Sequence, residues 1–275
     1  MPKKPNQMPQ QPSYRQVFLH PDWHILSPLL IIELSFLTRT NLQQHQIKHS
    51  TSAQIRNLLF KTTKLTAGHS DMKWNEILKR KDYSSEEPDK LVVQFTEFLR
   101  NKHARHVLDL GCGAGRHVIY LTKQGFETHG IDISEAGLKQ AKNRLKTEKL
   151  NATLIRCDMK TLPCISHCFD AIISLYTIYH NTKEGIKTTI TETHRILKQN
   201  GTIVLNFQSK RSSKYGKGTK IEEDTFIQDD EPEKGIIHHF VDKDEIHELL
   251  ENFKILELQS EEHEIWDIFG VAGQS

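Results

Sequence analysis

The feature that most constrains the fold is a glycine-rich segment at residues 107–115, which reads Val-Leu-Asp-Leu-Gly-Cys-Gly-Ala-Gly. The apolar run that leads into the glycines, from His106 to Leu110, predicts a buried strand. Apolar residues at helical spacing between Arg116 and Lys123 predict that a helix follows directly. Strand, glycine turn and helix in this order indicate a site for a nucleotide-like ligand, because the free amides at a helix start can meet a polar or anionic group.

The residues around the turn narrow the ligand. A dinucleotide fingerprint, Gly-x-Gly-x-x-Gly, would need its third glycine at position 116, which is Arg116. A P-loop is excluded because no Gly-Lys-Ser/Thr follows the glycines. Asp109, near the end of the predicted strand, would repel a pyrophosphate and would hold an ammonium group, directly or through water. The pattern therefore favours a ligand with a cationic group.

Two further predicted strand ends carry acids. Asp132 follows the predicted strand 127–131, where the second strand of such a unit places an acid on a ribose diol. Asp158 and Met159 follow the predicted strand 152–156. There the carboxylate can accept a hydrogen bond from an exocyclic amine, and the thioether can pack against a purine. Three acids at three successive strand ends thus fit the amino-acid head, the ribose and the adenine of one ligand.

With these motifs the chain resembles the class I S-adenosylmethionine-dependent methyltransferases of the small-molecule type, from about Met72 to the C-terminus. The segments 169–176 and 195–202 resemble two later motifs of that family. The resemblance implies S-adenosylmethionine as cofactor, no metal, and methyl transfer to an N, O or S atom of a small molecule by in-line displacement. The residues that it implies for cofactor binding are Asp109, Gly111, Cys112, Gly113, Asp132, Ile133, Asp158, Met159 and Ser174.

The segment 195–202 departs from the family's usual Leu-Lys-Pro-Gly-Gly turn between a helix and a strand. Gln199 stands in place of the proline and Thr202 in place of the second glycine. Both changes look tolerable if Gly201 still ends the preceding helix as its C-terminal cap.

The order of the predicted elements indicates a Rossmann-like, doubly wound α/β fold. Strands alternate with helices, which implies a mainly parallel sheet with helices on both faces. Two short final strands joined by a tight turn predict one antiparallel member in a seven-stranded sheet. The expected strands are 106–110, 127–131, 152–156, 169–176, 202–207, 254–258 and 264–269, and the main helices lie at 116–123, 134–147, 183–198 and from 242 onwards.

The best catalytic candidates follow the fourth strand, whose carboxyl end faces the shared crevice. His180 could accept a proton, and Tyr176 and Tyr179 could line the acceptor pocket. The alternative is that His180 only caps a loop and the two tyrosines pack. A base is needed only if the acceptor loses a proton as it reacts.

A second region of interest is the insertion 208–237, which is expected to form the lid over the acceptor. Its Tyr215 stands beside glycines and is a candidate for a pocket-facing aromatic residue. His238 and His239 return the chain to the core, and either is a candidate to reach the pocket. The alternative is a solvated loop whose opposite charges screen each other.

The N-terminal part differs in composition from the rest of the chain. Residues 1–71 carry a net charge of +5 and residues 72–275 a net charge of −3. We interpret 1–71 as an extension that is partly disordered or follows a mis-assigned start, and 72–275 as the methyltransferase domain. The apolar stretch 25–37 is too short to span a bilayer. We therefore expect a cytoplasmic protein without a membrane partner.

Composition and motifs also bear on metals and on other functions. The pair Cys164 and Cys168 has no second ligand pair at a matching distance, so the sequence predicts no metal site. An RNA- or protein-modifying enzyme of the same fold is an alternative, but the net acidic domain argues against nucleic acid. A cofactor-binding protein without turnover is the other alternative. The acceptor and the oligomeric state stay open.

Overall fold

The structure is a computed structural model, and it describes residues 69–80, 85–260 and 264–273. The predicted extension 1–71 lies outside the described residues except for its last three positions. Those positions belong to a helix, α4 (His69–Ile77), so Met72 lies inside a helix. In the described part of the chain, no helix has the length and apolar character needed to cross a bilayer.

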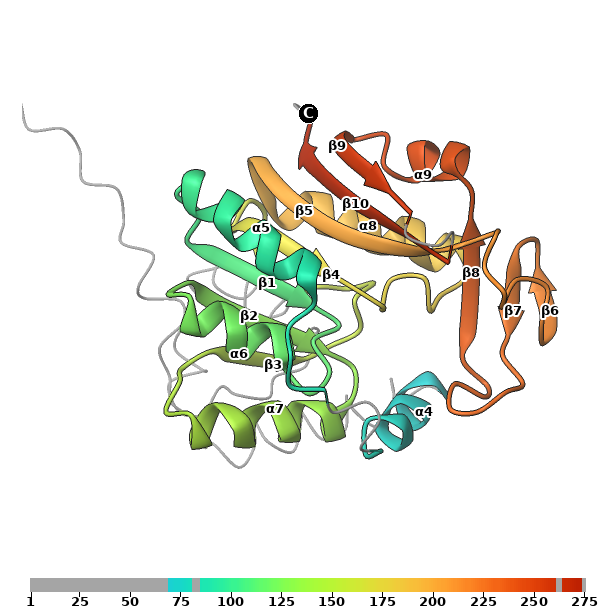
Figure 1. Ribbon diagram of the computed structural model, residues 1–275, viewed down its shortest axis with the longest axis horizontal. Helices are drawn as coiled ribbons and strands as arrows, with labels where there is room; N and C mark the ends of the chain where they lie inside the picture. Colours follow the sequence, from blue (N-terminus) through green and yellow to red (C-terminus); the bar gives the residue numbers. More distant parts are fainter. Residues whose placement is uncertain (1–68, 81–84, 261–263, 274–275) are drawn as a thin grey trace, which may run out of the picture.

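A twisted sheet forms the centre of the described chain (Figure 1). Its main body has the order β3-β2-β1-β4-β5-β10-β9. The first five strands pair in parallel, whereas β10 runs antiparallel to both of its neighbours. This confirms the predicted mainly parallel sheet with one antiparallel strand. The strands are β1 (His106–Leu110), β2 (Glu127–Asp132), β3 (Thr153–Arg156), β4 (Phe169–Ser174), β5 (Leu197–Ser209), β9 (Phe253–Gln259) and β10 (Ile265–Ala272).

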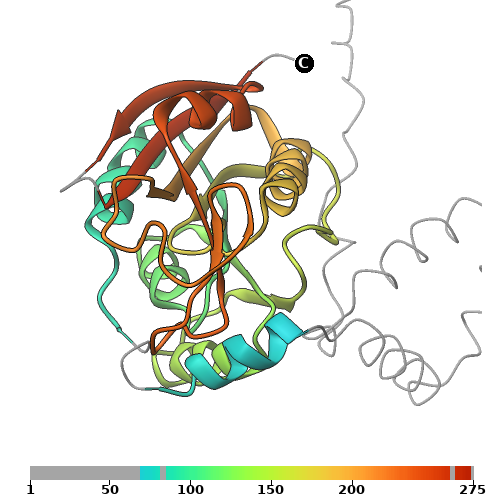
Figure 2. The ribbon, with the colours of Figure 1, turned by 90° about the vertical axis from the view of Figure 1, so that its right-hand side faces the viewer.

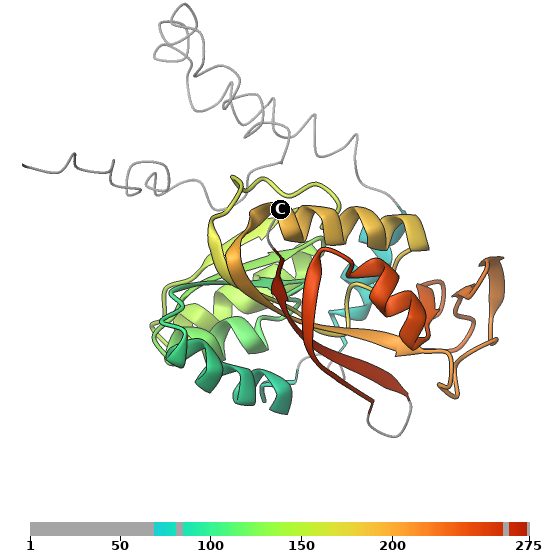
Figure 3. The ribbon, with the colours of Figure 1, turned by 90° about the horizontal axis from the view of Figure 1, so that it is seen from above.

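Helices cover both faces of this sheet because successive strand residues point to opposite sides. Val107 packs in a cluster with α5 and α6, whereas its neighbour Leu108 packs in a cluster with α8 and α9. Ile173 and Ile172 on β4 divide in the same way. Figure 3 shows α5 and α8 on opposite sides of the sheet. The helices are α5 (Lys90–Asn101), α6 (Arg116–Lys123), α7 (Glu135–Thr147), α8 (Lys183–Ile196) and α9 (Lys243–Leu249).

The insertion 208–237 forms an extension of the sheet rather than an irregular loop. Its strands β6 (Thr219–Glu222) and β7 (Thr225–Ile227) form a hairpin, and β7 pairs with β8 (Ile237–Val241). Strand β8 joins the far end of β5 through two residue pairs, Gln208–Phe240 and Ser209–Val241. These three strands therefore project beyond the parallel core, at the right of Figure 1.

The turn after α8 differs from the expected one. The helix ends at Ile196 and is followed at once by β5, so the prediction that Gly201 caps the helix is wrong. Asn200, with φ of 58°, takes the left-handed conformation instead. Gly201 is required for another reason: a Cβ there would lie 2.7 Å from Cγ of Leu197.

The glycine that begins α6 provides a test of this packing. Gly115 has φ of 81°, and a Cβ there would lie 2.7 Å from the Cβ of Ala141 on α7. Gly115→Ala should therefore lower the free energy of unfolding by about 2–4 kcal/mol, from backbone strain and overpacking together. Urea denaturation measures this value.

The matched control is Gly125→Ala. Gly125 also has a left-handed φ, of 91°, but nothing lies within 4 Å of its Cβ position. Only the conformational cost of about 1–2 kcal/mol should appear there. If both variants lost the same free energy of unfolding, the close approach of α6 to α7 would not contribute to the effect of Gly115→Ala.

Candidate active site

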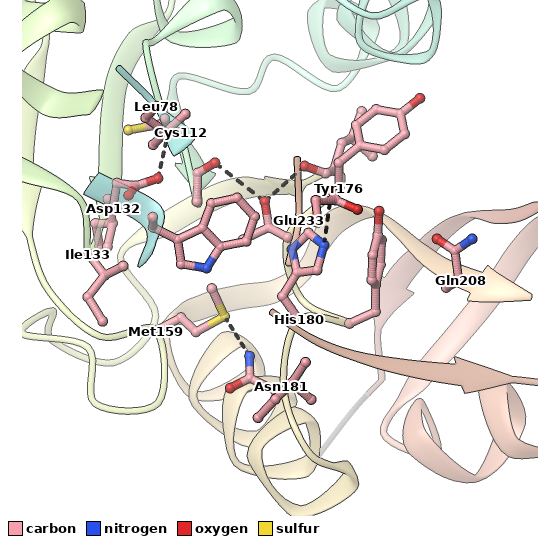
Figure 4. Close-up of a pocket in the computed structure, with 18 of the residues that line it drawn as sticks. Leu78, Cys112, Asp132, Ile133, Met159, Tyr176, His180, Asn181, Gln208 and Glu233 are labelled. Atoms are coloured by element: carbon pink, nitrogen blue, oxygen red, sulfur yellow. Dashed lines mark hydrogen bonds and ion pairs between the residues drawn. The ribbon is translucent and has the colours of Figure 1, made fainter. Parts of the chain in front are cut away.

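A cavity of about 810 Å³ opens at the carboxyl edge of the sheet, where β1, β2, β3 and β4 end (Figure 4). One half is walled by the turns that follow β1, β2 and β3. The other half is walled by the loop after β4 and by the insertion 208–237. Its volume lies in the range of small-molecule and cofactor sites, about 300–1,000 Å³. The two halves share one continuous space, so two ligands could meet inside it.

The glycine turn after β1 forms the floor of the first half. The backbone amides of Gly111 and Cys112 both donate to the carbonyl of Ile131, at 2.7 and 2.9 Å, which ties the turn to the end of β2. Gly111 has φ of 81°, and a Cβ there would overlap the side chain of Thr177. Glycine is therefore required at position 111 for two reasons: the backbone is left-handed there, and the Thr177 side chain leaves no room for a Cβ.

Asp132 lines the cavity at the end of β2, as predicted, and is held firmly. Its Oδ2 accepts a hydrogen bond from the amide of Gly113 and its Oδ1 one from the amide of Ser134, both at 2.7 Å. Burial raises the pKa of this carboxyl to about 6, although the two amides act in the opposite direction. Each oxygen keeps a further lone pair, so the carboxylate can still accept a ribose hydroxyl.

Asp109 lies deeper than the other predicted cofactor acids. It is 2% exposed and does not line the cavity. Its Oδ1 lies 3.8 Å from Nδ1 of His117, and His117 does line the cavity. Its Oδ2 is buried without a hydrogen-bond partner among the described residues. That orphaned acceptor fits a cationic ligand group nearby, reached through water or His117 rather than by direct contact.

The adenine side contains the predicted residues. Cys112, Ile133, Asp158 and Met159 all line the cavity, and the side-chain amide of Asn181 donates to the sulfur of Met159 at 3.6 Å. These groups fit the purine and ribose of an adenosyl cofactor.

The side chain of Ser174 is fully buried, and its hydroxyl donates to the carbonyl of Leu110 at 2.9 Å, which joins β4 to β1. Leu175, one residue later, lines the cavity. Contact of these two residues with the cofactor through their backbone groups stays a prediction.

Sequence reasoning missed the helix that covers the cavity. Trp74 and Leu78, from α4 and the turn after it, both line the space. Asn75 Oδ1 accepts from the hydroxyl of Ser134 at 3.0 Å and from the amide of Ala136 at 2.9 Å, which fastens α4 to the start of α7. Figure 2 shows α4 lying against α7. The available signal was the helical spacing of the two apolar residues.

Tyr176, the first predicted catalytic residue, lies at the rim and is 43% exposed. Its hydroxyl donates to Oδ2 of Asp89 at 3.0 Å, and its ring lies 5.6 Å from the guanidinium carbon of Arg116. Burial and the neighbouring Asp89 raise the pKa of Tyr176 above its ordinary value. The phenol therefore stays protonated at neutral pH and serves as a hydrogen-bonding wall.

Tyr179 and His180 lie inside the second half of the cavity. The His180 ring is surrounded by rings, with centroids 4.8 Å away in Trp74, 4.4 Å in Tyr179 and 4.7 Å in His238. Burial, assisted by His238, holds the pKa of His180 well below its ordinary value. The imidazole is therefore neutral at pH 7, which makes it a weak base but leaves it able to accept a hydrogen bond.

The insertion contributes Lys214 and Glu233 to the same half. Their side chains form an ion pair, with 2.8 Å between Nζ and Oε2. Although burial alone would raise the pKa of Glu233, His238, His180 and Lys214 hold it below its usual range. No sequence motif marked either residue, because each acquires its place only through the fold of the insertion.

Three other candidates of the insertion region do not line the cavity. The hydroxyl of Tyr215 donates to Asp224 at 2.6 Å and its ring packs on Phe226, so the prediction of a pocket-facing aromatic is wrong. His239 contacts Glu245 at 3.1 Å, in the interior. His238 is buried behind the wall, 3.3 Å from Glu233.

The fold and the cavity together define a Rossmann-like domain with a glycine turn and an acid for an adenosyl ligand. Comparison with known proteins supports this description of the fold and the cavity. The sequence model of the methyltransferase domain family matches residues 107–201. The "uncharacterized methyltransferase YdaC" of Bacillus subtilis is 31% identical over 118 residues, which are 42% of this chain and 62% of that protein.

Two further similarities extend this result. The dTDP-3-amino-3,4,6-trideoxy-alpha-D-glucopyranose N,N-dimethyltransferase of Streptomyces venezuelae is 29% identical over 129 residues, 46% of this chain and 50% of that protein. The chain thus spans about half the length of such relatives. The crystal structure of an S-adenosylmethionine-dependent methyltransferase from Methanosarcina mazei superposes with a TM-score of 0.57 and 19% identity, over 69% of this chain and all of that one. Residues 107–201 therefore match the methyltransferase domain family, and the solved structure shows the same Rossmann-like fold.

The raised pKa of Asp132 gives a test of the cofactor side. Ribose hydroxyls donate to the ionised carboxylate, so binding favours the form that is lost as pH falls through about 6. Affinity for S-adenosylmethionine should therefore drop below pH 6, by up to about tenfold per pH unit. Isothermal titration calorimetry between about pH 5 and 7 measures it.

The control for this experiment is Asp132→Asn, which keeps the shape of the side chain and removes the titrating group. Its affinity should be weaker at neutral pH and nearly constant over the same range. An equal pH dependence in both proteins would assign the titration to another group.

Proposed function

We propose that the protein transfers the methyl group of S-adenosylmethionine to an N, O or S atom of a small-molecule acceptor. The observation that carries the proposal is the shared cavity. Its first half has the residues that suit an adenosyl cofactor, and its second half continues the same space and is bounded by α4 and the insertion 208–237. The wall of that second half is formed largely by Trp74, Tyr179, His180, Gln208 and Glu233.

The chemistry asks little of the protein beyond position. When bound, the cofactor supplies a methyl group that its sulfonium already activates. The residues of the second half can align the acceptor and exclude water, effects worth about 7–11 kcal/mol in favourable cases. The one unprotonated ring nitrogen of the neutral His180 imidazole can accept a hydrogen bond from an acceptor N–H or O–H and so orient it toward the cofactor.

The volume of the whole cavity, about 810 Å³, supports a small-molecule acceptor beside the cofactor. The relative from Streptomyces venezuelae is named for methylation of an amino sugar nucleotide, which is a small molecule. An RNA acceptor is less compatible with the net charge of −3 over residues 72–275. A Pro-Cys pair of the kind that attacks cytosine C5 occurs at Pro163-Cys164, but Cys164 does not line the cavity.

The direct experiment measures release of S-adenosylhomocysteine from the full-length protein with a panel of metabolites. The proposal expects turnover with at least one metabolite and none with bulk RNA. Methyl transfer to RNA alone would favour the nucleic-acid alternative. Cofactor binding without any turnover would favour a non-catalytic binding protein.

His180→Ala tests the acceptor side once a substrate is found. The imidazole contacts the acceptor space and not the adenosyl half, so kcat should fall by at least about tenfold, the scale of a lost positioning contact. The dissociation constant of S-adenosylmethionine should stay within about twofold of the wild-type value. The control is His247→Ala, which removes an exposed imidazole on α9. Similar activity in both variants would make His180 a packing residue.

A further inference from the structure

We propose that His180, Glu233 and His238 bind a single divalent transition-metal ion of the zinc type at the acceptor end of the cavity. The sequence analysis predicts no metal site, because its one candidate pair, Cys164 and Cys168, lacks a second ligand pair. Here Glu233 and His238 lie close along the chain, but His180 is distant and the three belong to no ligand motif. Binding of the ion depends on these side chains alone and not on methyl transfer.

The geometry of the three side chains suits such an ion. Each offers a ligand atom, and these atoms all lie within 4.8 Å of one another. Nε2 of His238 lies 3.3 Å from Oε2 of Glu233, and Nε2 of His180 lies 4.0 Å from Oε1 of the same carboxylate. In a tetrahedral zinc site with bonds of about 2.0–2.2 Å, neighbouring ligand atoms stand about 3.3–3.5 Å apart. A small rotation of the His180 ring would therefore complete the triangle.

The burial of the two imidazoles gives an independent reason to expect a bound metal ion. The side chains of His180 and His238 are only 5% and 1% exposed. Both ring nitrogens of His180 and Nδ1 of His238 have no hydrogen-bond partner within the described residues, and Nε2 of His238 has only the Glu233 carboxylate, at 3.3 Å. Leaving buried nitrogens unsatisfied costs about 1–3 kcal/mol each. A bound ion would use one nitrogen of each ring and would remove part of this cost.

The backbone holds the three residues in place before any ion binds. The amide of His239 donates to the carbonyl of Tyr179 at 2.9 Å, which fixes β8 against the loop after β4. The amide of Ile236 donates to the carbonyl of Glu233 at 2.9 Å and closes the turn between Glu233 and His238. The ligand atoms are thus brought together by main-chain contacts and not by flexible side chains alone.

Lys214 is the one cation that competes for this carboxylate among the described residues of the site. Its Nζ lies 2.8 Å from Oε2 of Glu233, while Oε1 faces His180. The Lys214 side chain is 49% exposed, so it can turn toward solvent when an ion arrives. The carboxylate can also serve both cations, one with each oxygen.

The donor set points to zinc rather than to magnesium. Two imidazoles and one carboxylate are ligands of catalytic zinc sites, whereas magnesium prefers oxygen donors throughout. Three protein ligands leave a fourth position open. Since His180 and Glu233 line the cavity, that position faces the acceptor space. On the proposed function, it would take the nitrogen, oxygen or sulfur atom of the acceptor and so hold that atom in the acceptor space.

The test is metal binding by the full-length protein after treatment with a chelator. Titration with zinc chloride should show one ion per chain, with a dissociation constant below about 1 μM, and magnesium chloride should show none. Cobalt(II) should give the visible spectrum of a four-coordinate site without thiolate absorption. If neither zinc nor cobalt(II) bound to the wild-type protein, the proposal would be overturned.

Variants assign the site. His238→Ala and Glu233→Gln should each weaken zinc binding by at least about tenfold, the lower end of the loss expected for a disturbed metal site. The matched control is the double variant Cys164→Ser/Cys168→Ser, which removes two partly buried thiols elsewhere and should bind zinc as the wild type does. Loss of binding in the cysteine variant, or unchanged binding in both site variants, would contradict the assignment.

Affinity for S-adenosylmethionine, measured on the same samples, separates the two proposals. Retained affinity in the site variants shows that they are folded and that a change in zinc binding is local. Zinc binding without cofactor binding would leave the metal site standing while the proposed function fails. Cofactor binding and turnover without zinc would do the reverse.

Discussion

The carboxylate of Asp132 joins the parts on which the cavity depends. It accepts one backbone hydrogen bond from the glycine turn at Gly113 and one from Ser134 at the start of α7. The hydroxyl of Ser134 then bonds to Asn75, and so α4 is held over the opening. One side chain at the end of β2 thus connects the floor of the site to its cover. Such an arrangement also explains why a buried acid is tolerated there, since both oxygens have partners.

The second half of the cavity differs from the first in the kind of side chains that form its walls. Its walls are rings that contact one another, and its charged groups, Lys214 and Glu233, are paired. A neutral imidazole among aromatic rings offers one hydrogen-bond acceptor and one donor without a net charge. This environment suits an acceptor that must be desolvated before it meets a sulfonium, because a low dielectric strengthens the attraction between the reacting groups.

The cofactor half was largely predictable from the sequence, because its residues follow their own strands within a few positions. The glycine turn, Asp132, Asp158 and Met159 are examples of such local placement. The acceptor half was predictable only in part, because Tyr179 and His180 follow β4 directly. Glu233 and Trp74 reach the cavity only through pairing of β8 with β5 and docking of α4 on α7. The incorrect predictions for Gly201 and Tyr215 have one cause: each residue type was expected in its usual role, whereas long-range packing places it in another.

The backbone at Tyr176 has a consequence for how the protein can evolve. This residue holds φ of 56°, a conformation that costs a bulky side chain about 1–3 kcal/mol, and its amide is fixed to Asn206 at 2.6 Å. Glycine at this position would relieve that strain, but it would remove the ring at the rim with its contacts to Asp89 and Arg116, and it would add conformational entropy to the unfolded chain. The strained backbone and the side chain that lines the rim are therefore kept or lost together.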